Sequence, residues 1–415
     1  MNNINPPLSN YCLPNMNQHS SALNTSKTLV LRIIKDAGVI SRKTLAYYTG
    51  LTQASITNIT RELIENGLVI ENGLVEGEHR RRMVGLSIIP DRFCTIGVRV
   101  TSQYLVTGIF DINSQCIDLK KTYWDSFADV TATFEELSKE IRSFLTQADQ
   151  LQLTPIGFGL SLLGAFRLTR DTAIMTDIKG HSRDLQKYLS EEFALPVYTG
   201  SPSNCSLYYY ACNRDFNYLC DETVVLLTLS YDIDFSVMVN RSAVTGSASF
   251  PGSYGATMIT DCNGNSLSLW EAISTSNILL KAKRLADSNP DSLLNKYRNN
   301  LTFRNLLEIF YSGDPLVKDL FHYMADAIGY TLAQLIHAFH PHRIFIGDEI
   351  PISESFHHMV IEATRSHLPV SVSSEDFPQI ERLCILRETR NDPSLIGATL
   401  YATNKIIQDP EWIKQ

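Results

Sequence analysis

Residues 41–67, SRKTLAYYTGLTQASITNITRELIENG, predict two short helices joined by a tight turn. In the second helix Ile56, Ile59 and Leu63 recur at i, i+3 and i+7, which is the spacing of a helix face that packs into a core. Gly50 permits the sharp turn between the two helices. The segment therefore predicts a helical pair with one buried face and one free face.

The free face of the second helix is polar and suits contact with DNA. Ser41 and Thr52 are residue types that cap helices. Amide side chains suit adenine and arginine suits guanine. We expect base or phosphate contacts from Thr52, Gln53, Ser55, Thr57, Asn58 and Arg61. This pattern is typical of a helix-turn-helix whose second helix enters the major groove, and the alternative is an ordinary helical hairpin whose polar face only meets water.

The flanks favour the DNA interpretation. A helix predicted at about residues 26–37 completes a three-helix core, and two apolar runs after Gly67 predict a β-hairpin, or wing. The run HRRR at 79–82 lies near its tip, where we expect Arg80, Arg81 and Arg82 to contact phosphate or the minor groove. The alternative for these arginines is a solvated basic loop.

Charge is distributed unevenly along the 415 residues. Residues 1–92 hold ten Lys and Arg against seven Asp and Glu, a net charge of +3. The rest of the chain carries −11, which gives the total net charge of −8. A mildly basic head on an acidic body is consistent with a DNA module attached to a body that does not itself bind DNA.

Composition indicates an ordinary globular protein of two or three domains, with 44% hydrophobic residues. The eight cysteines form no CxxC pair, and no apolar run approaches the ~18 residues that span a bilayer. We therefore expect a cytoplasmic protein without a membrane association. Residues 1–25 contain no Lys, Arg, Asp or Glu and predict a disordered tail.

From about residue 90 the pattern changes to alternating strands and helices, which predicts α/β lobes. Helices are expected near 131–148, 183–193 and 203–214, then near 266–285, 302–311 and 314–339. The predicted domains are the tail at 1–25, a winged helix-turn-helix at 26–89, a first lobe at 90–200 closed by a helix at 393–407, and a second lobe at 201–392 for effector binding and oligomerisation.

This order of elements resembles the ROK family of bacterial sugar kinases and sugar-responsive repressors, over about residues 26–405. The segments that carry the resemblance are TIGVRVTSQYLVTGIFDINSQ (95–115), PIGFGLSLLGAF (155–166), FPGSYGATMITDCNGNSLSLWEA (250–272), RIFIGDEI (343–350) and SLIGATLYA (394–402). The resemblance implies a two-lobed body of the actin-like, ribonuclease H-like type. Because kinase members lack an N-terminal module, it favours the repressor branch.

The kinase motifs of the family are altered in this chain. Arg99 stands at the position of the aspartate in the first phosphate hairpin, and the second phosphate loop reads Ser-Tyr-Asp-Ile-Asp-Phe at 230–235. The catalytic aspartate of Asn-Asp-Ala-Asn is replaced by Pro202, which cannot act as a base. We therefore expect no kinase activity, no nucleotide cofactor and no enzymatic function.

The zinc and sugar positions are also eroded. Matching the family's His and three Cys gives Ala256, Cys262, Gly264 and Leu269, and a single thiolate does not hold a structural zinc. The candidates left for an effector site are Glu271, Asn204 and Ser253. Glu271 is equally suited to the first turn of a helix, and Asn204 to supporting backbone. Either a different molecule is sensed, or none.

We thus expect a repressor of carbohydrate metabolism that binds double-stranded operator DNA as a homodimer or tetramer. Its half-sites would be spaced by about one helical turn, ~34–36 Å. A sugar or other metabolite would act by changing the angle between the lobes. The alternatives are a sugar kinase with a regulatory DNA-binding head, and a regulator controlled by a protein partner or by oxidation of Cys205, Cys212 and Cys220.

Overall fold

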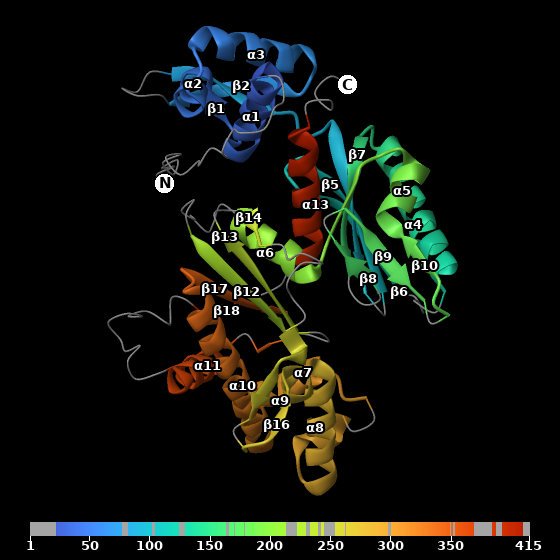
Figure 1. Cartoon of the computed structure of the whole chain (residues 1–415), viewed down its shortest axis with the longest axis vertical. Helices are drawn as coiled ribbons and strands as arrows, with labels where there is room; N and C mark the ends of the chain where they lie inside the picture. Colours follow the sequence, from blue (N-terminus) through green and yellow to red (C-terminus); the bar gives the residue numbers. More distant parts are fainter. Residues whose placement is uncertain are drawn as a thin grey trace. The chain divides into compact units, whose positions relative to one another are not determined.

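A computed structural model describes most of the chain, and Figure 1 shows its course. The described residues are 22–76, 82–101, 104–123, 129–162, 166–169, 171–177, 179–212, 222–229, 233–239, 242–244, 254–261, 263–297, 300–348, 350–351, 353–368, 384–386 and 392–409. The chain forms two compact units. The first unit joins Met1–Cys220 to Pro393–Gln415, and the second unit is Asp221–Asp392.

The first unit begins with a small helical head, residues 22–88. Its helices are α1 (Ala22–Ala37), α2 (Arg42–Thr49) and α3 (Gln53–Glu65). A three-stranded antiparallel sheet accompanies them in the order β1 (Ile40–Ser41), β3 (Arg82–Ile88) and β2 (Val69–Glu76). Because α1 begins at Ala22, the helix reaches into the predicted tail at 1–25, and residues 1–21 lie outside the described part of the chain.

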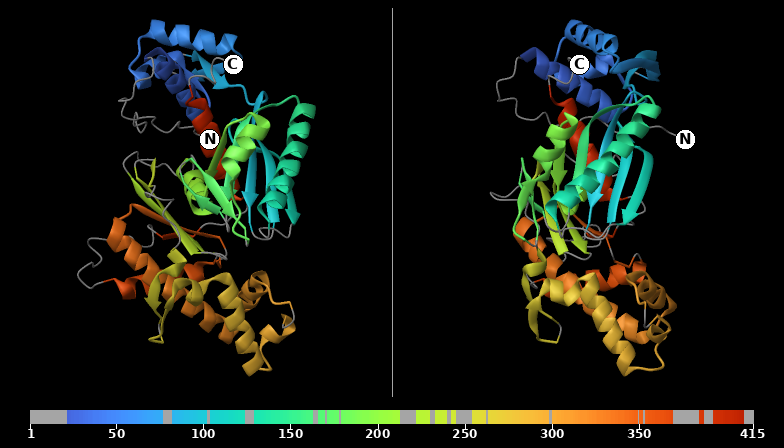
Figure 2. Two further views of the ribbon diagram at one scale, coloured as in Figure 1. Left: turned by 45° about the vertical axis from the view of Figure 1, so that its right-hand side comes forward. Right: turned by 90° about the vertical axis from the view of Figure 1, so that its right-hand side faces the viewer.

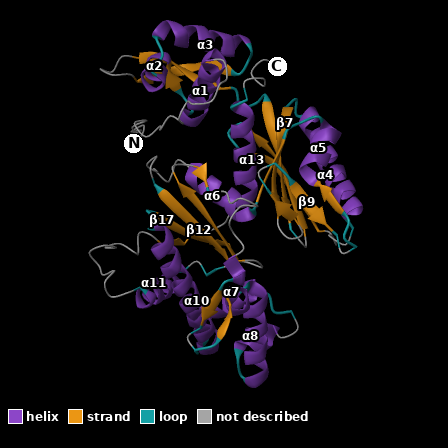
Figure 3. Ribbon diagram, viewed as in Figure 1, coloured by secondary structure: helices purple, strands orange, loops and turns teal. Residues whose placement is uncertain are grey.

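The larger part of the first unit is a five-stranded sheet between helices. Its order is β11 (Val197–Gly200), β7 (Thr154–Leu162), β4 (Phe93–Val100), β5 (Tyr104–Asp111) and β6 (Cys116–Tyr123). The pairs β11–β7 and β7–β4 are parallel, and the remaining pairs are antiparallel. The helix α13 (Pro393–Ile407) covers one face, and α4 (Val130–Gln150) covers the other (Figure 3).

Two further helices and a small sheet complete the first unit. The helices are α5 (Leu185–Phe193) and α6 (Pro202–Cys212), and the sheet has the order β10 (Ser182–Asp184), β9 (Ala173–Thr176) and β8 (Phe166–Leu168). We predicted that the first lobe ends at residue 200. The structure instead divides the units after Cys220, since α6 packs closely on α13.

Glycines make that close packing possible. A Cβ on Gly397 of α13 would lie 1.8 Å from the backbone oxygen of Cys205 on α6. A Cβ on Gly159 of β7 would lie 2.4 Å from the backbone oxygen of Ala398. Both distances are far below van der Waals contact, so only glycine allows α13 to approach the sheet and α6 this closely.

The second unit is built around another five-stranded sheet. Its order is β14 (Ser242–Ala243), β13 (Ile233–Val239), β12 (Thr223–Leu229), β17 (Arg343–Asp348) and β18 (Cys384–Leu386). The described helices are α7 (Leu269–Ile273), α8 (Thr275–Ser288), α9 (Phe303–Ser312), α10 (Pro315–Phe339) and α11 (Glu354–His367), with short 3₁₀ turns at Tyr254–Ala256 and Leu293–Tyr297. Phe310, Phe321 and Phe356 are in mutual ring contact within its core.

A hairpin of β15 (Met258–Thr260) and β16 (Ser266–Ser268) precedes α7. We predicted one helix over 266–285, which is wrong, because residues 266–268 form this strand and Ser274 separates α7 from α8. Ser274 ends α7 in an extended conformation and caps α8 through its side chain. Within the described residues, no helix combines the length and the apolar character that crossing a membrane requires.

Candidate DNA interface and effector site

The helix α3 is positioned by its own hydroxyl groups. Thr52 caps it, with Oγ1 accepting the backbone N–H of Ser55 at 3.2 Å and lying 2.9 Å from Ser55 Oγ. The Thr57 hydroxyl donates to the backbone oxygen of Gln53 at 2.8 Å. Three of the predicted DNA-contacting hydroxyls are therefore already used to start and brace the helix.

The remaining polar residues of α3 form an exposed face. Gln53, Asn58 and Arg61 are exposed, and among the described residues their side chains make no hydrogen bond or ion pair. The opposite face is buried and consists of Ile56, Ile59, Thr60 and Leu63. Amide and guanidinium groups without partners face solvent opposite a sealed core, which is the arrangement that reading base edges requires.

Sequence reasoning missed two exposed residues of α2 and α3. Ala54 is exposed beside Gln53, and a small apolar side chain there suits the methyl group of thymine. Tyr47 on α2 is 81% exposed, and a phenol on the first helix of such a pair suits a phosphate. Ala54 could have been found from the sequence, because it lies one residue after Gln53 and three before Thr57, which were both predicted to contact DNA.

Charged contacts hold α3 to its neighbours. Arg42 donates from Nε to Thr60 Oγ1 at 3.0 Å and from Nη2 to Glu71 Oε1 on β2 at 2.8 Å. Lys27 on α1 forms an ion pair with Glu62 on α3. These contacts fix the orientation of α3 relative to α1, α2 and β2.

The predicted wing is described only in part. Strands β2 and β3 pair as expected, and Gly73, with φ +65°, lies at an irregularity between Glu71 and Leu74. Arg80 and Arg81 lie outside the described residues, and although Arg82 begins β3, its side chain is outside them as well. Their predicted contacts with DNA stay a prediction.

The head is joined to the sheet of the first unit by hydrogen bonds and by a common core. Arg92 donates from Nη1 to the backbone oxygens of Asn66 and Gly67, each at 2.7 Å. Gly67 suits this position, because its φ of +65° is a backbone conformation that residues with a side chain rarely adopt. One apolar cluster combines the head core with residues of the sheet and of α13, namely Phe93, Ile112, Ile156, Ile406 and Ile407.

A buried lysine extends this junction to α13 and α6. Lys35 on α1 is 6% exposed, and its Nζ donates to Asn404 Oδ1 on α13 at 2.9 Å. Asn404 Nδ2 in turn donates to the hydroxyl of Tyr208 on α6 at 2.9 Å. The views in Figure 2 show α1 next to the end of α13. Sequence reasoning missed Lys35, although a lysine within an apolar helix stripe was visible.

Asn204 is the predicted effector residue whose surroundings suit a ligand. It is 6% exposed, and its Nδ2 donates to Ser201 Oγ at 2.8 Å. Among the described residues, its buried Oδ1 has no hydrogen-bond partner, and the same holds for Oγ of the fully buried Ser161 on β7. Ser161 is paired with Gly200 at the ends of the neighbouring strands β7 and β11. One of these buried oxygens thus comes from the end of β7 and the other from the first turn of α6, which follows the neighbouring strand β11, and a bound molecule there would satisfy them.

The other two effector candidates are placed differently. Glu271 is exposed and forms a capping box on α7. Its Oε2 accepts the backbone N–H of Ser268 at 2.8 Å, and Ser268 Oγ accepts the backbone N–H of Glu271 at 3.2 Å. The bond from the Ser268 backbone lowers the pKa of Glu271. Its carboxylate therefore has a structural role, as its first-turn position allowed. Ser253 lies outside the described residues, and Asn204 and Glu271 belong to different units.

Asp261 holds the turn of the β15–β16 hairpin, in the region that matches the family's zinc motif. Its Oδ1 accepts the backbone N–H groups of Asn263 at 3.0 Å and Asn265 at 2.8 Å. Its Oδ2 accepts Asn265 Nδ2 at 3.2 Å and the Tyr323 hydroxyl at 3.3 Å. Cys262 lies outside the described residues, and within the described part no three His, Cys, Asp or Glu side chains are grouped to bind a metal.

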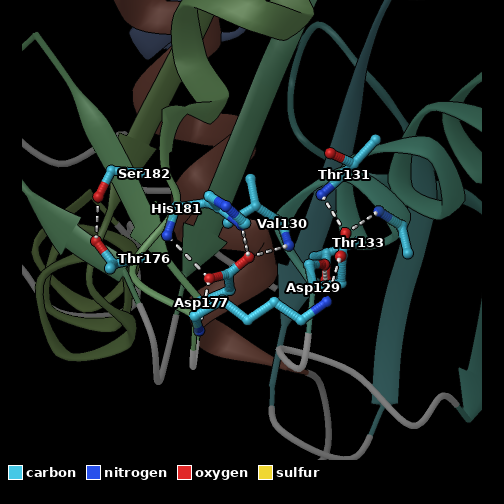
Figure 4. A network of polar contacts seen from close by, with 10 residues as sticks. Asp129, Val130, Thr131, Thr133, Thr176, Asp177, His181 and Ser182 are labelled. Atoms are coloured by element: carbon cyan, nitrogen blue, oxygen red, sulfur yellow. Dashed lines mark hydrogen bonds and ion pairs between the residues drawn. The ribbon is translucent and has the colours of Figure 1, made fainter.

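A similar carboxylate lies in the first unit, at the start of α4 (Figure 4). Asp177 Oδ1 accepts the backbone N–H groups of Lys179 and His181, each at 2.9 Å, and Oδ2 lies 3.2 Å from His181 Nδ1. Burial opposes the charge of Asp177, but these hydrogen bonds outweigh it and lower its pKa. The network fastens the loop after β9 and indicates no catalytic role.

Comparisons with known proteins identify the family and several relatives of the chain. The family model described as ROK family matches residues 95–405. The xylose repressor of Caldicellulosiruptor bescii is 22% identical over 80% of this chain and 85% of that protein. The DNA-binding transcriptional dual regulator NagC of Escherichia coli K12 is 23% identical over 84% of this chain and 88% of that protein.

A solved structure resembles most of the chain. It is a ROK family transcriptional regulator described as a homologue of the Escherichia coli Mlc protein. The match has a TM-score of 0.78 at 17% identity and covers 95% of this chain and 99% of the other. It confirms the mixed α/β fold. Since the family model spans most of the sequence, from the first strand of the large sheet to α13, the chain belongs to the ROK family.

Proposed function

We propose that this chain is a DNA-binding transcriptional repressor of the ROK type and that its head is a winged helix-turn-helix. The observation that carries the proposal is the exposed face of α3, where Gln53, Asn58 and Arg61 have no partner among the described residues. Names of relatives support the same function, because the xylose repressor and NagC are regulators by name.

In this proposal each group on α3 has a distinct task. Asn58 and Gln53 read adenine, which offers an acceptor and a donor side by side in the major groove, and Arg61 reads guanine. The free N–H groups at the start of α3 and Tyr47 on α2 contact phosphates, as do Arg80, Arg81 and Arg82 of the wing. Two copies of the chain would place two such helices on half-sites about one helical turn apart.

The body in this proposal senses rather than catalyses. Pro202 is the first residue of α6, where a kinase of the family has its catalytic aspartate, and it offers no group that accepts a proton. Asn204 and Ser161 instead present two buried oxygens that accept hydrogen bonds, which suits a molecule rich in hydroxyl groups. A thermal-shift screen of the full-length protein against sugars tests this part, and ATP turnover with hexoses would contradict it.

DNA binding is tested by fluorescence anisotropy with the full-length protein and the DNA upstream of its own coding sequence. Affinity should fall steeply between ~50 and ~200 mM salt, because phosphate contacts release counterions. Asn58→Ala should weaken binding by about 1–3 kcal/mol at that site. Glu65→Ala, an exposed residue at the end of the same helix, is the control. Equal affinities for the two variants would contradict the assignment of α3.

A further inference from the structure

The second unit contains a cavity of about 590 Å³ that is widely open to solvent. None of the residues discussed for DNA or effector binding lines it. It lies where the β15–β16 turn meets α8 and α10. Its lining residues are Asp261, Asn263, Asn265, Leu267, Lys281, Arg284, Leu285, Ser288, Leu320 and Tyr323. A volume of this size is typical of sites for small molecules, ~300–1,000 Å³.

The wall of the cavity is fixed by a chain of hydrogen bonds. Lys281 Nζ donates to the Tyr323 hydroxyl at 3.0 Å, and that hydroxyl donates to Asp261 Oδ2 at 3.3 Å. Asp261 also accepts both backbone N–H groups of the hairpin turn and the Asn265 amide. The single carboxylate among the lining residues is therefore bound to hydrogen-bond donors of the protein, and no ion pair joins it to Arg284 or Lys281 among the described residues.

Two cations face the same cavity from α8. Lys281 and Arg284 are three residues apart, so they lie on one face of the helix. Within the described residues, the exposed Arg284 guanidinium has neither a hydrogen bond nor an ion pair. The second unit holds 13 Lys and Arg against 21 Asp and Glu, so a cavity lined by two cations and one acid is a local exception to its charge.

The rest of the lining suits the carbon skeleton of a metabolite. Leu267, Leu285 and Leu320 supply an apolar surface, and Asn263 and Ser288 offer groups that exchange hydrogen bonds with hydroxyls. We propose that this cavity binds a small organic anion, with its phosphate or carboxylate held by Arg284 and Lys281. The site is separate from Asn204 and Ser161, and it does not depend on the proposed repressor function.

Isothermal titration calorimetry on the full-length protein tests the proposal with four probes. Glucose 6-phosphate and gluconate carry the two anionic groups on similar skeletons, inorganic phosphate carries the anion alone, and glucose is the neutral control. We expect one anionic probe to bind the unmodified chain. Arg284→Glu should weaken its Kd at least about tenfold, since a hydrogen bond to a charged group contributes ~1.5–3 kcal/mol.

Lys283→Glu is the matched control, because it makes the same charge change on an exposed neighbour that does not line the cavity. It should bind the probe with a Kd within about twofold of the unmodified chain, since only the diffuse field changes. Equal weakening by both variants, or no binding of any anionic probe, would overturn the proposal. Anisotropy on operator DNA with Arg284→Glu separates the two functions, because a lost anion site should leave DNA affinity unchanged.

Discussion

The helix α3 of the head and the β15–β16 hairpin of the second unit use polar residues in opposite ways. On α3 the amide of Asn58 and the guanidinium of Arg61 face solvent without partners among the described residues. In the hairpin, Asp261 is 8% exposed and accepts four hydrogen bonds from three residues. Polar groups that satisfy one another stabilise a fold, whereas polar groups left open are available to a ligand.

The largest expected effect concerns the exposed polar face of α3. Arg61→Ala should weaken operator binding by about 1–3 kcal/mol, which is about 5- to 150-fold in Kd, because the proposed bidentate contact to guanine would be lost. Its Tm should stay within about 1 °C, since a surface substitution costs at most ~0.5 kcal/mol. Anisotropy and thermal melting measure the two quantities.

Thr57→Val is the control for that variant on the same face. The Thr57 hydroxyl already donates to the Gln53 backbone oxygen, so it has no proton left for a phosphate or a base acceptor. DNA affinity should change by less than about threefold. If Thr57→Val weakened binding as much as Arg61→Ala, the distinction between used and open polar groups on α3 would fail.

The next largest effect concerns the β15–β16 hairpin, whose polar groups are hydrogen-bonded to one another. Asp261→Ala should lower the free energy of unfolding by about 1–3 kcal/mol, because the donors of Asn263, Asn265 and Tyr323 lose their acceptor. Thermal melting of the full-length protein measures the loss, with Asp291→Ala, an exposed carboxylate outside the cavity, as the control. DNA affinity at 25 °C should be unchanged, and an equal loss of DNA affinity would show that the regions are not independent.

The smallest expected effect is a dependence on pH. Burial raises the pKa of Asp261, but hydrogen bonds from Asn265 and Asn263 outweigh it, so the folded value lies below the ordinary 3.8. A lowered pKa contributes stability that is fully present above pH 3.8 and is lost as pH falls through the folded pKa. Tm should therefore fall in acid more steeply for the unmodified chain than for Asp261→Asn, and parallel curves would contradict this role.

Local features of the head were predicted well, because they depend on residues close together in the chain. Ser41 and Thr52 cap α2 and α3, and Gly50 adopts φ +67° at the end of α2, as their positions indicated. The apolar spacing of Ile56 and Leu63 matches their complete burial. Caps, turns and amphipathic spacing are local signals, so one sequence is enough to find them.

Contacts between distant residues were not predictable in the same way. The burial of Lys35 depends on Asn404, 369 residues later, and the placement of α6 depends on its contact with α13. The role of Asp261 depends on Tyr323, which belongs to another helix. The break at Ser274 was missed because residues on both sides of it have helical spacing. The buried oxygens of Asn204 and Ser161 that lack a partner among the described residues could be identified only from the structure, because burial cannot be assigned to single atoms from the sequence.

The shared core of the head has a consequence for how the chain is made. Ile406 and Ile407 of α13 belong to the same apolar cluster as Val30, Leu31 and Leu63 of the head. During synthesis the head leaves the ribosome first, yet these partners are added more than 300 residues later. A nascent chain thus carries a head core that lacks two of its apolar side chains until residues 406 and 407 have been added.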